Sequence, residues 1–181
     1  MTDQRPAVVE SVSLGAQHAF SKQPQPAIEL VADCGVVGDA HAGATVQHVA
    51  TKRRSATAPN LRQVHLVEAE LLDQLCERGY DVAPGALGEN ITTRGIDLLA
   101  LGVDTILAIG DARLLVTGIR TPCFQIDRFR RGLVAELTID KRAKRFRTGV
   151  MSVVLAGGTV RPGDAVTAIP DPGPFRPLPL V

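Results

Sequence analysis

Aromatic residues are scarce in this chain of 181 residues, which contains five Phe, one Tyr and no Trp. Proteins that bind single-stranded nucleic acids stack bases on exposed aromatic side chains, and few are available here. The formal net charge is only +1, whereas a general nucleic-acid binder normally has a strongly basic balance. Both shortages argue against nucleic acid as the ligand.

Cysteine is also rare, with single residues at positions 34, 76 and 123. The number is odd, the spacing is wide and no C-x-x-C motif occurs, which argues against a disulfide framework, a Cys-rich zinc site or an iron–sulfur centre. In a reducing compartment each cysteine is then either a small buried hydrophobe or a reactive thiol.

Long apolar runs are missing as well. No segment approaches the roughly 20 apolar residues of a transmembrane helix, and the N-terminus lacks the charged-then-apolar pattern of a signal peptide. We therefore expect a soluble cytoplasmic protein with no membrane partner. The 45% content of hydrophobic residues is enough for a folded domain.

Glycine and proline are plentiful, with 17 and 12 residues scattered along the chain. Glycines and prolines at such frequent intervals are typical of many turns between short strands. Segments with strand-like patterns are 7–14, 28–31, 61–67, 105–109, 113–118, 150–156 and 165–169. The sequence predicts a mainly β fold, a closed or nearly closed β-barrel of about seven or eight short strands with a few helical insertions.

The domain organisation expected from this pattern is one β-barrel domain over residues 1–169, followed by a Pro-rich C-terminal tail over 170–181. The tail contains five prolines. Because proline has no N–H to donate to a ladder, we expect this segment not to pair with a sheet.

One helix is predicted with a clear apolar stripe. Leu71, Leu72 and Leu75 share a face at helical spacing and predict a helix over 68–78. Cys76 extends that stripe, so we expect it in the core.

Cys123 lies in the segment T-G-I-R-T-P-C-F-Q-I-D, where a strand is predicted to end and a helix to begin. Pro122 suits the first turn of a helix and Thr121 suits its cap. A helix N-terminus and the nearby Arg120 would both favour the thiolate form. Gly132 predicts that this helix is short or broken. These residues alone leave two alternatives open, a reactive thiol and a buried structural cysteine.

Several groups are candidates for binding an anion. Arginine binds phosphate in a bidentate way, and a glycine-rich loop can offer backbone amides. The candidates are Arg62, Arg120, the basic segments 52–54 and 145–147, and the glycine loop 35–43. Basic surface segments are more often simply solvated, and no nucleotide-binding glycine motif occurs in a strand–helix context.

A zinc site built by the protein is not favoured. Asp39, His41, His48 and His65 are possible ligands, but they lack the paired spacing of a zinc motif. Histidines beside glycines in a loop are more often hydrogen-bonding partners.

Five blocks in this order resemble the MOSC domain, named after the C-terminal part of molybdenum-cofactor sulfurase. They are G-V-V-G-D-A-H-A-G (35–43), L-R-Q-V-H-L-V-E (61–68), P-G-A-L-G-E-N-I-T-T-R-G-I-D-L-L (84–99), I-G-D-A-R-L-L-V-T-G-I-R-T-P-C-F-Q-I-D (109–127) and G-V-M-S-V-V-L-A-G-G-T-V-R-P-G-D (149–164). The resemblance implies a β-barrel that binds the molybdenum cofactor (molybdopterin), a pterin with a dithiolene and a phosphate.

By the same resemblance, Cys123 would be the molybdenum ligand and the catalytic residue. A soft metal site takes a thiolate ligand readily. The resemblance makes six further residues candidates to bind the cofactor or shape its pocket: Arg120, Asn90, Thr92, Asp39, His41 and Arg62.

Two functions follow from the resemblance. The first is reduction of a small N-hydroxylated substrate, with electrons from a separate electron-transfer protein because the chain has no cysteine cluster for an iron–sulfur centre. The second is a sulfur carrier that holds a persulfide on Cys123 and works with a cysteine desulfurase. A barrel with a purely structural cysteine is the third alternative.

Overall fold

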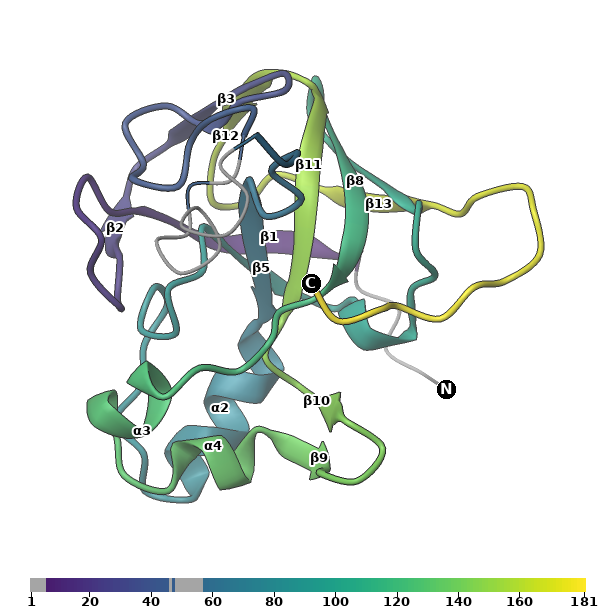
Figure 1. Cartoon of the computed structure of the whole chain (residues 1–181). Helices are drawn as coiled ribbons and strands as arrows, with labels where there is room; N and C mark the ends of the chain where they lie inside the picture. The colour runs from purple at the N-terminus through teal and green to yellow at the C-terminus, as the bar shows by residue number, and fades with distance from the viewer. Residues whose placement is uncertain (1–5, 46, 48–56) are drawn as a thin grey trace.

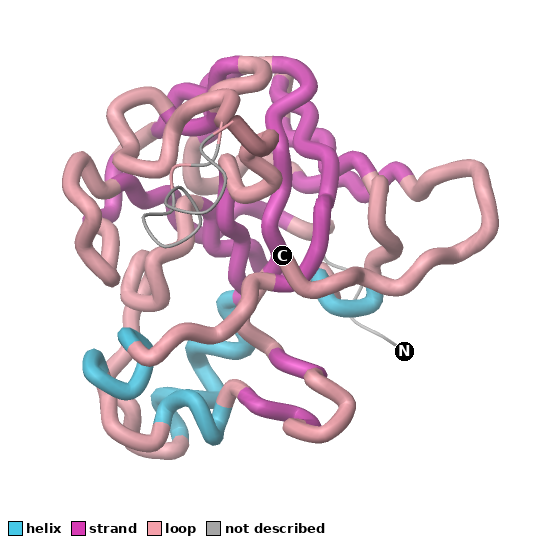
Figure 2. The backbone as a smooth tube through the Cα atoms, in the orientation of Figure 1, coloured by secondary structure: helices cyan, strands magenta, loops and turns pink. Residues whose placement is uncertain are grey.

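The computed structural model describes residues 6–45, 47 and 57–181 (Figure 1). Within these residues the chain forms thirteen strands and a few short helices, so the predicted mainly β class is confirmed (Figure 2). His48 and the basic segment 52–54 lie outside the described residues. No helix in the described ranges is long and apolar enough to cross a membrane.

The largest sheet has eight strands in the order β13-β7-β8-β11-β5-β6-β1-β2. All neighbours are antiparallel except β5 and β6, whose parallel pairing needs a crossover connection. Helix α2 (Ala69–Glu77) lies in that connection. The strands are β1 (Val8–Leu14), β2 (Gln23–Gln25), β5 (Val64–Glu68), β6 (Ile91–Arg94), β7 (Ile106–Ile109), β8 (Ala112–Ile119), β11 (Val150–Ala156) and β13 (Val166–Ile169).

The remaining elements are small. A second sheet has the order β12-β3-β4, and β9 and β10 form a hairpin. Their bounds are β3 (Ile28–Val31), β4 (Gly35–Val36), β9 (Thr138–Asp140), β10 (Arg145–Phe146) and β12 (Gly158–Val160), and the short helices are η1 (Leu98–Ala100), α3 (Gln125–Phe129) and α4 (Leu133–Glu136). Figure 1 shows α2, α3, α4 and the β9–β10 hairpin gathered below the sheets.

No sheet of the described ranges is closed by paired strands along its full circumference. Main-chain bonds nevertheless connect β1 with the start of β13. Val9 N–H donates to Asp164 O at 2.8 Å, and Val166 N–H donates to Ala7 O at 2.8 Å, on either side of an isolated bridge between Val8 and Ala165.

Two apolar clusters hold these parts together. The larger lies between the sheets, where alternate residues of β8, such as Leu114 and Val116, point inward as the pleat requires. The smaller joins α2 to α3 and α4 through Leu75, Ile126 and Leu133. The loop that carries Cys123 therefore connects a strand of the large core to a helix of the small one.

Two predictions for local structure need correction. Cys76 is exposed and not in the core, because it is one position along α2 from the buried Leu75 and so points about 100° away from it. Its thiol donates to Val82 O at 3.2 Å. The polar segment Ile91–Arg94, which is not among the predicted strands, forms the interior strand β6, where Thr92 and Thr93 are buried.

The C-terminal segment also differs from its prediction, because it does pair with other strands. Isolated bridges join Gly102 to Pro177 and Ile119 to Leu180. Proline cannot donate, but the carbonyl of Pro179 still accepts from Ile119 N–H, and Val181 N–H is the donor to Ile119 O. We call residues 177–181 the C-terminal strap. The predicted domain boundary at residue 169 stays a prediction.

Candidate functional site

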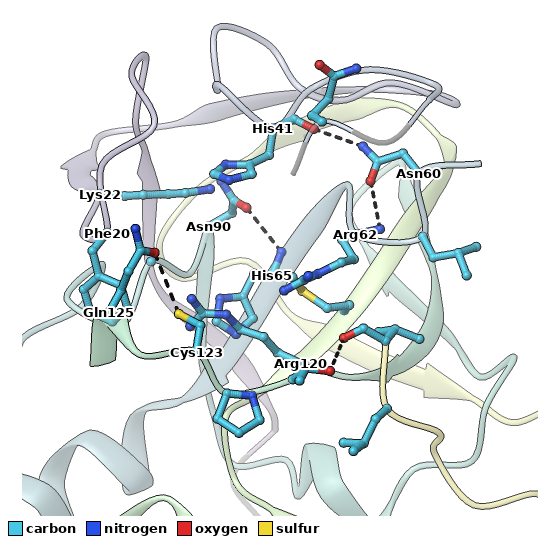
Figure 3. Close-up of a pocket in the computed structure, with 18 of the residues that line it drawn as sticks. Phe20, Lys22, His41, Asn60, Arg62, His65, Asn90, Arg120, Cys123 and Gln125 are labelled. Carbon is cyan, nitrogen blue, oxygen red and sulfur yellow. Dashed lines mark hydrogen bonds between the residues drawn. The ribbon is translucent and has the colours of Figure 1, made fainter. Parts of the chain in front are cut away.

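A cavity of about 620 Å³ opens beside Cys123 (Figure 3). This volume falls in the range of about 300–1,000 Å³ that is usual for small-molecule sites. Five basic side chains belong to its lining: Lys22, His41, Arg62, His65 and Arg120. Apolar residues complete it: Phe20, Leu61, Pro122, Met151, Leu180 and Val181.

Cys123 lies in the loop between β8 and α3 and is half-buried. Its thiol is 3.7 Å from Gln125 Oε1. The predicted helix start at this cysteine is wrong, because α3 begins at Gln125 with Phe124 as its N-cap. The thiol therefore precedes the helix and is not in its first turn.

The physical reason lies at Thr121. Its N–H donates to Val181 O at 3.0 Å, and its hydroxyl donates to the same oxygen at 2.8 Å. Both bonds hold Thr121 against the C-terminal strap, and the chain turns into α3 only after Cys123.

Arg120 is fixed at the cavity by bonds at both ends. Its Nη1 donates to Leu87 O at 2.7 Å, and its N–H donates to Gly149 O at 3.0 Å. Burial lowers the pKa of the Arg120 guanidinium, while the nearby Cys123 raises it. Arginine stays protonated in proteins, so a buried positive charge lies beside the thiol.

Arg62 is the second guanidinium near the thiol. Burial and the charge of Arg120 lower its pKa, and Cys123 again acts in the opposite direction. Its position is set by Asn60, whose Oδ1 accepts from Arg62 N–H at 3.1 Å and whose Nδ2 donates to His41 O at 3.0 Å. Figure 3 shows the Arg120 side chain beside Cys123 and the Arg62 side chain in the lining of the same cavity.

Lys22 is a cavity residue that the sequence analysis missed. It lies in a polar loop with no motif around it, so no local signal singles it out. Its ammonium is 2.7 Å from Asp39 Oδ2, and the side chains are 5% and 1% exposed. Burial lowers the pKa of Lys22, and the charge of Asp39 opposes that shift.

Asp39 is behind the lining rather than in it, and it organises the residues that are. Its Oδ2 also accepts from Asn90 Nδ2 at 3.0 Å and Gly15 N–H at 3.2 Å, and its Oδ1 accepts from His41 N–H at 3.0 Å. Burial alone would raise the pKa of this carboxyl. The hydrogen bonds from His41 and the charge of Lys22 outweigh burial, so the pKa is well below its ordinary value.

Asn90 lines the cavity, but its amide hydrogens are used within the protein. Nδ2 donates to Ser13 O at 3.2 Å as well as to Asp39, and Oδ1 accepts from His65 N–H at 3.2 Å. Thr92 is not part of the lining; its hydroxyl donates to the buried carboxylate of Glu89 at 3.2 Å.

His65 is buried, with Nε2 2.8 Å from Thr148 O. Burial, assisted by the charge of Arg120, places its pKa well below the ordinary value of 6.5. The imidazole is therefore neutral at pH 7. Because a carbonyl can only accept, Nε2 carries the hydrogen.

The glycine loop 35–43 does not offer its amides to a ligand as predicted. Ala40 N–H donates to Gly15 O at 2.8 Å, Ala42 N–H to Asp39 O at 3.1 Å, and Gly43 N–H to Cys34 O at 2.7 Å. Positive charge at the cavity comes from side chains instead.

The structure thus brings together five of the seven predicted site residues: Cys123, Arg120, Arg62, His41 and Asn90. Asp39 supports them from behind, and Thr92 is elsewhere in the core. Over the described ranges, no group of three or more His, Cys, Asp and Glu side chains is placed to hold a metal ion.

A family model for the MOSC domain matches residues 41–167, well over half of the chain. The chain belongs to the MOSC domain family. Solved structures share the fold. The YuaD protein from Bacillus subtilis is 22% identical, with a TM-score of 0.74 over 91% of this chain and 96% of that one.

Two YiiM proteins are also similar to this MOSC domain. YiiM from Geobacillus stearothermophilus is 18% identical, with a TM-score of 0.65 over 91% of this chain and 75% of that one. YiiM from Escherichia coli is 19% identical, with a TM-score of 0.61 over 94% and 72%. No curated protein sequence matches the chain significantly.

Proposed function

We propose that this MOSC domain binds the molybdenum cofactor in the cavity beside Cys123 and reduces small N-hydroxylated compounds. The observation that carries the proposal is one cavity whose lining contains a thiol, two guanidinium groups and a buried ammonium: Cys123, Arg62, Arg120 and Lys22. The MOSC family is associated with this cofactor.

The residues present suit such a ligand. A phosphate-bearing cofactor needs positive charge, and guanidinium groups match phosphate oxygens in a bidentate way. Arg62 and Arg120 would hold the anionic end, with Lys22 adding a third charge. Cys123 would supply a thiolate, which soft metal sites favour. When bound, the cofactor supplies a redox-active metal centre.

The chain's own residues prepare this environment. Asp39 holds Lys22, and Leu87 O holds Arg120, so their charges are fixed before any ligand arrives. His65 stays neutral and bonds Thr148, so the fixed positive charge comes from the arginines and Lys22. The apolar part of the lining lowers the local dielectric constant, which strengthens the attraction between these cations and an anion.

The reaction also defines the partners. Reduction of an N–OH group to N–H consumes two electrons and two protons and releases water. Since the sequence offers no cysteine cluster for a second redox centre, a separate electron-transfer protein would supply the electrons. The substrate would be a small N-hydroxylated molecule.

The predicted barrel belongs to the same proposal. We infer that seven strands form a closed or nearly closed barrel, in which the bonds between β1 and the start of β13 join the two ends of the sheet. Such a barrel would hold the end of β8, and hence Arg120 and Cys123, in a fixed place.

Metal content tests the proposal directly. The protein is expressed in a host that makes the molybdenum cofactor, and molybdenum and pterin are measured per mole of protein. Cys123→Ala is expected to lose the molybdenum, and Cys76→Ala, which changes an exposed thiol outside the cavity lining, is expected to keep it. Wild-type protein without metal or pterin from such a host contradicts the proposal.

Sulfur transfer is the second candidate function. It is supported by the half-buried position of Cys123 near two half-buried guanidinium groups, Arg62 and Arg120, which would stabilise an anionic persulfide. The thiolate would take the terminal sulfur from a desulfurase persulfide and leave the desulfurase as a thiol. After incubation with a cysteine desulfurase and cysteine, a mass gain of one sulfur atom on Cys123 supports this function. Cofactor binding without any reductase activity also favours it over the first.

A further inference from the structure

The C-terminal strap runs beside the last residues of β8 and ends in the cavity wall. Figure 1 shows the yellow C-terminal segment returning from β13 to this end of β8. Ile119 N–H donates to Pro179 O at 2.7 Å, and Val181 N–H donates to Ile119 O at 3.0 Å. With the two bonds from Thr121 to Val181 O, four hydrogen bonds hold the strap here.

The strap occupies an edge that β8 leaves open. On one side β8 pairs with β11 as far as Ile119. On the other side its ladder with β7 covers only Ala112–Leu115. Unpaired backbone groups at the end of β8 would need other partners, and Pro179 and Val181 supply them at Ile119.

Gly118 makes this close approach possible. A Cβ atom at that position would collide with Pro179 O and would be only 2.9 Å from Val181 Cγ1. Any side chain at residue 118 would therefore push the strap away from β8. The strap is thus held against β8 by its close fit to Gly118 as well as by hydrogen bonds.

The seated strap places Leu180 and Val181 in the lining of the cavity, in the same apolar surface as Leu61, Pro122 and Met151. Leu178 instead packs against the large core. The cavity thus has a cationic part formed by Lys22, Arg62 and Arg120 and an apolar part to which the strap contributes.

We propose that the strap forms an apolar subsite that takes a hydrophobic substituent of the substrate and limits the size of molecules that reach Cys123. The identity of the ligand as a substrate rests on the proposed function, whereas the position of the strap in the cavity lining does not. Ligands with a small polar reacting group and a compact apolar body fit this arrangement, because burial of apolar surface stabilises their binding.

Thiol alkylation tests whether the strap limits access to Cys123, and it needs no cofactor. The full chain is treated with iodoacetamide, which is small, and with N-(1-pyrenyl)maleimide, which is bulky and also uncharged. The rate at Cys123 is followed by mass spectrometry of its peptide, and the exposed Cys76 serves as the internal reference. The variants are Leu180→Ala and Gly118→Val, with Leu178→Ala as the control.

Leu180→Ala is expected to raise the rate with the bulky reagent about tenfold and the rate with iodoacetamide less than about twofold. Gly118→Val is expected to act in the same direction by displacing the strap. Leu178→Ala should leave the ratio of the two rates unchanged. Circular dichroism and urea midpoints establish that each variant is folded, and Leu180→Ala alone is sufficient if Gly118→Val does not fold.

Three results overturn the inference. The first is that, in the wild-type protein, the ratio of the Cys123 rate to the Cys76 rate is the same for both reagents. The second is no change of the ratio in Leu180→Ala. The third is an equal change in Leu178→Ala, which would mean general loosening. Because none of these measurements involves molybdenum, failure of the strap inference and failure of cofactor binding are separate outcomes.

Discussion

Lys22 Nζ and Asp39 Oδ2 form a salt bridge of 2.7 Å in which both side chains are almost completely withdrawn from water. This pair connects the loop before β2 to the glycine loop after β4. It also holds an ammonium at the cavity that would bind an anion. The pair therefore links the stability of the fold to the charge of the site.

Asp39→Asn is expected to lower the free energy of unfolding by about 3–5 kcal/mol, because it leaves the Lys22 ammonium buried without a counter-charge. Urea denaturation followed by circular dichroism measures the change. The buried donors of His41, Asn90 and Gly15 also lose the carboxylate that they share.

The double variant Lys22→Met with Asp39→Asn is the control. Removing the ammonium removes the uncompensated charge, so the double variant should be more stable than Asp39→Asn alone. If the two substitutions instead destabilise additively, the salt bridge is not the source of the loss.

His65 should make the stability depend on pH. Its pKa in the folded protein is well below the ordinary value of 6.5, so below that pH the unfolded chain binds a proton that the folded chain does not. Stability from this residue is therefore present above pH 6.5 and is lost as the pH falls below it, by up to about 1.4 kcal/mol per pH unit. Urea midpoints between pH 7 and pH 5 measure the slope.

His65→Gln isolates this contribution, because glutamine can still donate to Thr148 O but does not titrate. The difference in stability between wild type and variant should shrink as the pH is lowered from 7 to 5. A difference that stays constant over that interval would show that His65 is protonated equally in both states.

Much of the site could be predicted from the chain, because its residues cluster in short motifs. Arg120 and Cys123 are three positions apart, and the strand before them was recognisable from its alternation. Lys22 could not be predicted, since its role depends on a contact with Asp39 across two loops. Burial of both partners is a property of the packed fold and leaves no trace in local sequence.

The strap and β6 were missed for related reasons. Five prolines argue against a strand, yet pairing at Ile119 needs only the carbonyl of Pro179 and the N–H of Val181. The threonines of β6 resemble a polar loop, yet Thr92 is buried because its hydroxyl bonds Glu89. At the strap a partner distant in sequence, and at Thr92 a carboxylate three residues earlier, bonds a group that local patterns assign to water.

Gly149 should tolerate no side chain. Its φ is +82°, and a Cβ atom would collide with Leu66 O and be 2.7 Å from His65 Nε2. Gly149→Ala combines left-handed strain with overpacking and is expected to cost about 3 kcal/mol or more in the free energy of unfolding. Gly163→Ala is the matched control, because Gly163 has a φ of +91° and open space around it. Equal losses in the two variants, measured by urea denaturation, would rule out a steric role for Leu66 and His65.

Arg62 should attract anions to Cys123. The side chain lines the cavity, and its positive charge interacts with the thiol. Arg62→Gln is expected to slow the reaction of Cys123 with the dianionic 5,5′-dithiobis(2-nitrobenzoate) about threefold to tenfold at low salt, and to leave the rate with neutral iodoacetamide nearly unchanged. Salt should reduce the effect of the substitution, because at 0.1 M dissolved ions screen the attraction between charges that are more than about 10 Å apart in solvent.

Arg161→Gln, at an exposed arginine outside the lining, serves as the charge-matched control and should change neither rate. A parallel slowing of both reagents by Arg62→Gln would contradict a role of Arg62 in attracting anions, because the neutral reagent does not depend on that attraction.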